Sequence, residues 1–113
     1  LTSVIRGKLK KNKNWVDLIT ACWPGGSITG APKLRSCQRL FEIERYGRGP
    51  YCGSFIKVDW NGEFDSNILI RSFMIQNKKI NISAGCGIVS DSDPQDETEE
   101  LKWKLLPLID SLK

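Results

Sequence analysis

The feature that most constrains the fold of this chain is a run of strand-like segments in its middle, separated by short turns. The segments "YCGSFIKVDW" and "FDSNILIRSFMIQ" flank Asn61-Gly62, a dipeptide typical of tight hairpin turns. "NKK" marks a further turn into "INISAG". The pattern predicts an antiparallel sheet over about residues 51–85.

Helical patterns stand on both sides of this block. Residues 15–23 have helical spacing, with Trp15, Leu18, Ile19 and Cys22 on one face. Residues 32–46 predict a second helix with a buried face of Leu34, Cys37, Leu40, Phe41 and Ile43 or a neighbour. Pro94 opens a closing helix through about Leu112, and "SVIRGKL" near the start predicts a short strand. The expected fold class is α+β, an antiparallel sheet with helices packed on it.

Length and composition exclude several classes of protein. The 113 residues suit one domain, and the net charge of +4 comes largely from a cluster at Lys8, Lys10, Lys11 and Lys13. Without aromatic interleaving or a basic face, this cluster predicts a solvated turn and no nucleic-acid partner. No apolar run has the length of a membrane span. We also expect no signal peptide.

The lack of histidine and the spacing of the four cysteines limit the chemistry that this chain can carry out. The chain has no histidine, which excludes histidine acid–base catalysis. Its four cysteines form no C-x-x-C pair, so the spacing argues against a zinc site. We expect reduced thiols and a cytoplasmic location.

The stretch "WPGGSITGAPK" resembles a phosphate-binding loop at first sight. Gly25 and Gly30 have the separation of a Walker loop, but Ala31 and Pro32 stand where Lys and Ser/Thr are needed. The stretch therefore predicts the start of a helix, with Ser27 or Thr29 as its cap and Pro32 in its first turn.

The stretch "AGCGIVSDSDPQDETEELKWK" carries the clearest candidates for a binding site. Gly85-Cys86-Gly87 forms either a backbone nest for a carboxylate or phosphate, or a simple β-bulge. Glu97 and Glu100 share a helix face, either as Mg²⁺ ligands or as solvated acids near the positive end of the helix dipole. Lys104 lies one turn further on, where it contacts an anionic ligand or pairs with Glu100.

Two further cations are candidates. Arg71 follows "NILI" in an expected half-buried strand, where an arginine needs an anion: Asp59, Asp65 or a ligand carboxylate. Lys33 would serve as a catalytic amine only if burial depressed its pKa.

Taken together, five motifs resemble the C-terminal portion of the chorismate-utilising enzymes, from Ser3 to the end of the chain. They are "GGSITGAPKLRS", "RGPYCGSF", "FDSNILIRSF", "SAGCGIVSDSDP" and "ETEELKWK". The loop "GGSITGAPK" is similar to component I of the aminodeoxychorismate synthase branch, whereas the anthranilate synthase branch usually has a Gly-Thr-x-Ser-Gly-Ala-Pro-Lys version.

The resemblance implies a set of site residues. Tyr51 and Arg71 match positions that contact a substrate carboxylate, and Ser27 matches a hydroxyl position near chorismate. Gly85-Cys86-Gly87 matches a Gly-x-Gly segment whose backbone amides receive a carboxylate, with Cys86 in place of the usual small residue.

The closing helix completes this set. Glu97 and Glu100 match an acidic pair near Mg²⁺, and Lys104 matches the lysine on that helix. We therefore expect seven substrate-binding residues and two metal ligands: Ser27, Tyr51, Arg71, Gly85, Cys86, Gly87 and Lys104, with Glu97 and Glu100 for the metal.

The implied reaction converts chorismate and ammonia to 4-amino-4-deoxychorismate, for para-aminobenzoate and folate synthesis. Mg²⁺ is the implied cofactor, and a glutamine amidotransferase subunit or domain is the implied ammonia source. The family's nucleophilic lysine belongs to an upstream Pro-Ile-Lys-Gly-Thr motif, so we expect no catalytic residue in this chain. Residues 1–113 are then the C-terminal part of a chorismate-binding domain, truncated at its N-terminus and inactive alone.

Two alternatives remain open. In the first alternative, within the same family, the parent is an anthranilate synthase component I or another chorismate-utilising enzyme of the salicylate or isochorismate type. In a different class, the chain is a non-catalytic binding module. If it is a fragment, we expect exposed apolar surface.

Overall fold

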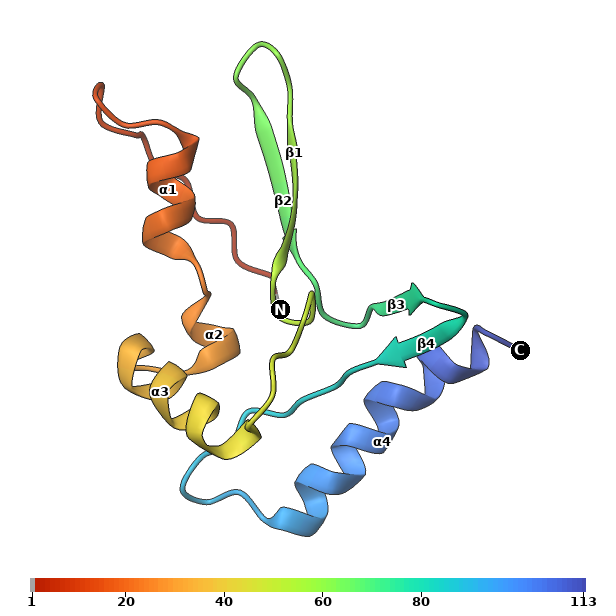
Figure 1. Cartoon of the computed structure of the whole chain (residues 1–113). Helices are drawn as coiled ribbons and strands as arrows, with labels where there is room; N and C mark the ends of the chain where they lie inside the picture. The colour runs from red at the N-terminus through yellow and green to blue at the C-terminus, as the bar shows by residue number, and fades with distance from the viewer. Residues whose placement is uncertain (1) are drawn as a thin grey trace.

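A computed structural model describes residues 2–113 and confirms the α+β class (Figure 1). The elements follow one another as α1 (Trp15–Cys22), α2 (Gly26–Thr29), α3 (Lys33–Glu44), β1 (Ser54–Val58), β2 (Phe64–Ile68), β3 (Phe73–Gln76), β4 (Lys79–Ile82) and α4 (Pro94–Asp110). In Figure 1 the helices α1 to α3 lie on one side of the β1–β2 hairpin and α4 lies on the other.

Both predicted hairpins are present. β1 pairs antiparallel with β2 from Ser54↔Ile68 to Val58↔Phe64, with Asn61-Gly62 in the connecting turn. β3 pairs antiparallel with β4 from Phe73↔Ile82 to Gln76↔Lys79, around the predicted turn at Asn77 and Lys78. The antiparallel strands form two separate two-stranded sheets rather than one continuous sheet.

The break between the two sheets lies at the segment 69–72. The β1–β2 ladder extends one step beyond the strands, where Cys52 N–H donates to the carbonyl of Leu69 at 3.0 Å. Arg71 then adopts φ 51°, in the left-handed region that ends a strand. Arg71 therefore stands at a bend between hairpins, and the expectation that it lies inside a strand is wrong.

The helices α1 and α4 begin at side-chain caps. Asn14 caps α1 by accepting from the N–H groups of Val16 and Asp17, and the Asp17 carboxylate accepts from Asn14 N–H in return. Asp93 caps α4 by accepting from Gln95 and Asp96, one residue before Pro94. The predicted opening of the closing helix at Pro94 is confirmed.

The capping prediction for the glycine-rich loop is wrong. Ser27 and Thr29 lie inside the short helix α2, and α3 begins after Pro32 without a side-chain cap. Gly30 ends α2 with φ 99° and ψ 173°, a conformation that only glycine adopts readily. The loop thus turns sharply between two helices because a residue without a Cβ stands at Gly30.

The chain is open. Its radius of gyration is 16.8 Å, against about 13 Å for a compact domain of this length. None of the residues 2–113 is fully buried. Within the same residues, no helix is long and apolar enough to cross a membrane.

This openness corrects two expectations. The apolar face of α3 is not covered, since Leu34, Phe41 and Ile43 are 75%, 84% and 73% exposed. The predicted strand at residues 3–9 is also wrong, since these residues form no strand and belong to neither of the two sheets described. The expected exposed apolar surface is confirmed.

A few side-chain contacts connect the elements across this open arrangement. The rings of Trp15 in α1 and Phe64 in β2 lie 5.9 Å apart between centroids. The ammonium of Lys33, at the start of α3, donates to the carbonyls of Ala21 and Cys22 at 3.2 and 3.3 Å. Lys33 therefore satisfies the free carbonyls at the C-terminal end of α1.

We expect Gly30→Ala to lower the free energy of unfolding by about 1–3 kcal/mol, the usual cost of a side chain in this backbone region. The new Cβ would also meet Ser36 Oγ at 2.9 Å. Urea unfolding followed by far-ultraviolet circular dichroism measures the change. Gly47→Ala is the matched control, because its Cβ meets no atom within 4 Å. Equal stability of the two variants would contradict the conclusion that the turn between α2 and α3 requires glycine at position 30.

Candidate functional site

A cavity of about 860 Å³ is lined by three of the helices and by the loops that follow α3, β2 and β4. Its walls come from α2, the end of α3 and the following loop, the bend at Ile70 and Arg71, residues 82–88, and the C-terminal half of α4. Three cationic side chains line it: Arg48, Arg71 and Lys104. Glu44 is the one carboxylate among the lining residues described. The excess of positive charge suits an anionic ligand.

The predicted substrate-binding residues all line this cavity. Ser27 lies on α2 and is exposed, and Tyr51 is half-buried in the loop before β1. Arg71 is exposed at the bend between the hairpins. Neither Asp59 nor Asp65 pairs with Arg71, and Asp59 instead lies 3.4 Å from Lys57. Within residues 2–113 Arg71 has no ion-pair partner, so its guanidinium is available to a ligand anion.

The segment Gly85-Cys86-Gly87 runs along the wall of the cavity between β4 and α4. None of its three backbone N–H groups has an acceptor within residues 2–113. The glycines do not have positive φ angles, so the segment is not curled into the predicted nest. The three amides are nevertheless free donors beside a cavity lined by cations.

Gly85 has a steric reason to be glycine. A Cβ at this position would lie 2.8 Å from the hydroxyl oxygen of Tyr51. The phenol of Tyr51 thus reaches the backbone of the Gly85 segment, and two of the predicted binding groups share one corner of the cavity. Burial raises the pKa of the Tyr51 phenol, with a further contribution from Cys52.

Lys104 connects α4 to the same segment. Its ammonium forms an ion pair with Glu100 one turn earlier and donates to the carbonyl of Gly85 at 2.9 Å. The hydrogen bond that Lys104 donates to Glu100 is the main cause that raises the pKa of Lys104. Of the two alternatives for Lys104, the pairing with Glu100 is the one the structure contains.

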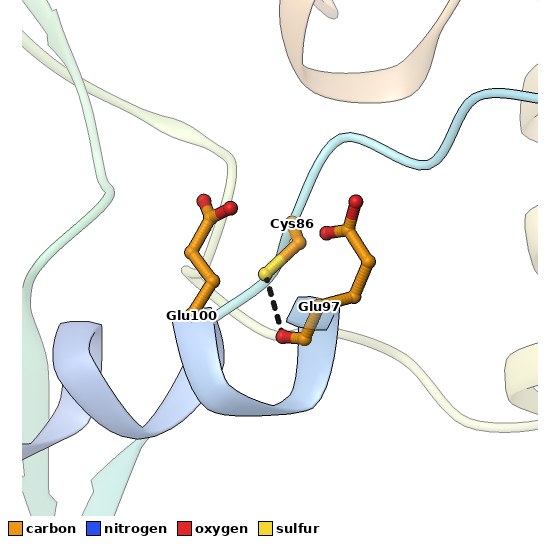
Figure 2. Close-up of side chains that lie close together, drawn as sticks. All are labelled: Cys86, Glu97 and Glu100. Atoms are coloured by element: carbon orange, nitrogen blue, oxygen red, sulfur yellow. Dashed lines mark hydrogen bonds between the residues drawn. The ribbon is translucent and has the colours of Figure 1, made fainter. Parts of the chain in front are cut away.

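Glu97 and Glu100 lie side by side on α4 with Cys86 between them, and both carboxylates point to the same side of the helix (Figure 2). One ligand atom from each of the three side chains lies within 4.8 Å of the others. The Cys86 thiol donates to the backbone carbonyl of Glu97 at 3.4 Å. Glu97 Oε1 accepts from Ser92 Oγ at 2.7 Å, whereas Oε2 is shielded from solvent and has no partner.

This donor set fits a divalent cation. Carboxylate oxygens are the ligands that Mg²⁺ prefers, and the unpartnered Glu97 Oε2 is a buried oxygen that a cation would satisfy. Glu97 and Glu100 are the residues that would hold it.

One ion pair in the site was not singled out from the sequence. Glu44, near the end of α3, receives a bidentate pair of hydrogen bonds from Arg48, with Nε to Oε2 at 2.8 Å. Arg48 also donates to Cys52 Sγ at 3.3 Å and lies 5.9 Å from the centroid of the Tyr51 ring. The four-residue spacing of Glu44 and Arg48 was the available signal, although "GRGP" ends the helix before Arg48.

Lys33 does not belong to the cavity. Its contacts at the end of α1 give it a structural role, and the sequence hypothesis of a catalytic amine at Lys33 finds no support in its position.

Comparisons with known proteins show what the chain is similar to. Residues 1–110 match the family model described as chorismate binding enzyme. The chain is 46% identical over 92% of its length to "Aminodeoxychorismate synthase, chloroplastic" of Arabidopsis thaliana, covering 11% of that protein. It is 36% identical over its full length to "Anthranilate synthase component 1" of Synechocystis sp., covering 23% of that protein. The same protein of Bacillus subtilis is 42% identical over 88% of the chain, which spans 19% of it.

We expect the Glu44–Arg48 pair to stabilise the chain above pH 4.5 and to lose this effect in acid. The hydrogen bond from Arg48 lowers the pKa of Glu44 below its ordinary value of 4.5. A lowered folded-state pKa contributes stability above the unfolded pKa, and the contribution disappears as pH falls through the folded value. The free energy of unfolding should therefore differ between wild type and Glu44→Gln at neutral pH, and the difference should shrink below pH 4.5.

Urea titrations at several pH values measure this difference. Glu42→Gln is the control, because Glu42 pairs with Arg39 on the surface, where both side chains are more than half exposed. Such surface pairs contribute little. A difference between wild type and Glu44→Gln that stays constant down to pH 3 would contradict the prediction.

Proposed function

The chain belongs to the family of chorismate-binding enzymes, and from this premise we propose that it supplies one side of the chorismate site in an aminodeoxychorismate synthase component I. The observation that carries the proposal is the convergence on one cavity of Arg71, Tyr51, three free backbone amides and, at its edge, an acidic pair. The chain spans about a tenth to a quarter of the length of these relatives, so the reaction and its partners are proposals for the parent protein.

In this proposal, different residues of the cavity bind different groups of a dicarboxylate substrate. Arg71 and the Tyr51 hydroxyl bind one carboxylate through charge-assisted hydrogen bonds, and the amides of Gly85, Cys86 and Gly87 bind a carboxylate from the adjoining wall. Ser27 supplies a hydroxyl from α2. Lys104 keeps the Gly85 segment against α4 by its bond to the Gly85 carbonyl. Each of these groups binds or orients the substrate, and none acts as a nucleophile.

Mg²⁺ is part of the proposal. When it is bound by Glu97 and Glu100, it supplies Lewis-acid and templating chemistry for the departure of the C4 hydroxyl group as ammonia adds. If the Lys104 ammonium moved away from Glu100, the Glu100 carboxylate would be free to bind the cation.

The remaining parts of the reaction belong elsewhere in the parent. The proposal places the nucleophilic lysine upstream of this chain and takes ammonia from a glutamine amidotransferase subunit or domain, so the isolated chain is inactive. The four cysteines are free thiols, which supports a reducing compartment such as the cytoplasm.

A second candidate is anthranilate synthase component I. Anthranilate synthases are more numerous than aminodeoxychorismate synthases among the relatives found, at 32–42% identity. The loop Gly25–Gly30 favours the aminodeoxychorismate branch, as does the 46% identity to the Arabidopsis protein. Incubating the full-length parent with chorismate, ammonia and Mg²⁺ separates the two: 4-amino-4-deoxychorismate supports the proposal, and anthranilate overturns the branch assignment.

We expect the chain to bind chorismate more tightly in millimolar Mg²⁺, measured by isothermal titration. Arg71→Ala should weaken binding roughly tenfold or more, because a hydrogen bond to a charged group is worth about 1.5–3 kcal/mol. Glu100→Gln should remove the Mg²⁺ dependence while leaving the weaker, metal-independent binding.

Arg39→Ala and Glu99→Gln are matched controls, since both side chains form surface pairs away from the cavity. Chorismate binding that is indifferent to Arg71 and Glu100 would show that the cavity is not the substrate site. A chain that binds neither chorismate nor a related dicarboxylate would leave the family membership in place and would show that the site needs the rest of the parent protein.

A further inference from the structure

The cluster of Cys86, Glu97 and Glu100 has a feature that a magnesium site does not need. A thiol lies between the two carboxylates, within 4.8 Å of an oxygen of each (Figure 2). Magnesium binds through hard oxygen ligands, whereas a thiolate is a soft ligand that favours zinc and similar ions. The cluster therefore offers two hard ligands, the carboxylates, and one soft ligand, the thiol.

We propose that Cys86, Glu97 and Glu100 form a three-ligand site for a thiophilic divalent cation, of the class of Zn²⁺ and Cd²⁺. Neighbouring ligand atoms of a tetrahedral zinc ion lie about 3.5 Å apart, given Zn–S near 2.3 Å and Zn–O near 2.0 Å. The ligand atoms of the three side chains now lie within 4.8 Å of one another, so a movement of about 1 Å brings them to the separation that zinc needs. Glu100 is exposed and its side chain is free to make this adjustment.

A second observation supports the site independently of the spacing. Glu97 Oε2 has less than 1 Å² of exposed surface and no hydrogen-bond partner, although Oε1 of the same carboxylate is satisfied by Ser92. A buried carboxylate oxygen without a partner is costly, and cation binding removes this cost. The remaining lone pairs of Glu97 are thus prepared for a cation rather than for solvent.

Lys104 acts as the internal competitor of the metal. Its ammonium pairs with Glu100 and lies 3.9 Å from Cys86 Sγ, so it occupies the charge position that a cation would take. On binding, the Cys86 thiol releases its proton to solvent and the thiolate joins the metal, while the Lys104 ammonium leaves Glu100 with its proton retained. Binding adds two positive charges and releases one proton, so the net charge of the cluster together with Lys104 rises from about −1 to about 0.

The sequence argued against such a site because no cysteine or histidine stands close to Cys86 along the chain. The turn between β4 and α4 brings Cys86 against α4, next to residues 11 and 14 positions later. Three protein ligands leave a fourth coordination position open to water or an anion. A thiophilic ion in this position occupies the same carboxylates as Mg²⁺ and therefore excludes it.

The test is a titration of the reduced chain with CdCl₂, followed by the ultraviolet charge-transfer absorption that only a cadmium–thiolate bond produces. We expect one equivalent of Cd²⁺ to produce the band and Cys86→Ser to abolish it. Glu97→Gln and Glu100→Gln should each weaken binding at least tenfold.

Two matched controls define the specificity. Cys37→Ser removes a comparably half-buried thiol from α3, and Glu99→Gln removes the carboxylate next to Glu100 that pairs with Lys102. Both should bind Cd²⁺ within twofold of wild type. A band that survives in Cys86→Ser, or equal effects of Glu99→Gln and Glu100→Gln, overturns the proposal.

A measurement on the unmodified sequence guards against variants that fail to fold. Alkylation by iodoacetamide, mapped by peptide mass spectrometry, should be slowed at Cys86 by Cd²⁺ and unchanged at Cys37. Equal protection at both thiols, or none at Cys86, also overturns the proposal. Because neither experiment contains chorismate, their outcome is independent of the proposed function, which fails on chorismate binding alone.

Discussion

The ammonium of Lys104 is the contact on which the site depends. It joins the carboxylate of Glu100 on α4 to the backbone of Gly85 after β4, two segments that otherwise have little to hold them together. No residue of the described chain is fully buried, so hydrophobic burial cannot fix their relative position. Polar contacts made by single side chains therefore carry more of the geometry here than in a compact domain.

Those contacts also set the charge of the cavity. Lys104 neutralises Glu100, and Arg48 neutralises Glu44, so each cation near the cavity except Arg71 has a carboxylate partner within residues 2–113. Arg71 owes its availability to the bend after β2, where a left-handed residue turns the chain away from the ladder. An anionic ligand thus meets one unpaired guanidinium and a row of free amides.

The acidic pair and Cys86 bring hard and soft ligand atoms together in one cluster. Two carboxylates on one helix face suit a hard cation, and the thiol across from them suits a soft one. The 85–87 segment lies against α4 through the contacts of the Lys104 ammonium with the Gly85 carbonyl and with Cys86 Sγ.

Local pattern determined much of this protein. The Asn61-Gly62 and Asn77-Lys78 turns, the opening of α4 at Pro94 and the one-sided placement of Glu97 and Glu100 follow from short-range sequence, because turn chemistry and helical spacing act over a few residues. Tertiary structure alone decided that α3 is uncovered, that Arg71 sits at a bend, that Lys33 caps α1, and that Cys86 meets the acidic pair. Each of these depends on which distant segment arrives beside a residue, and no local propensity specifies that.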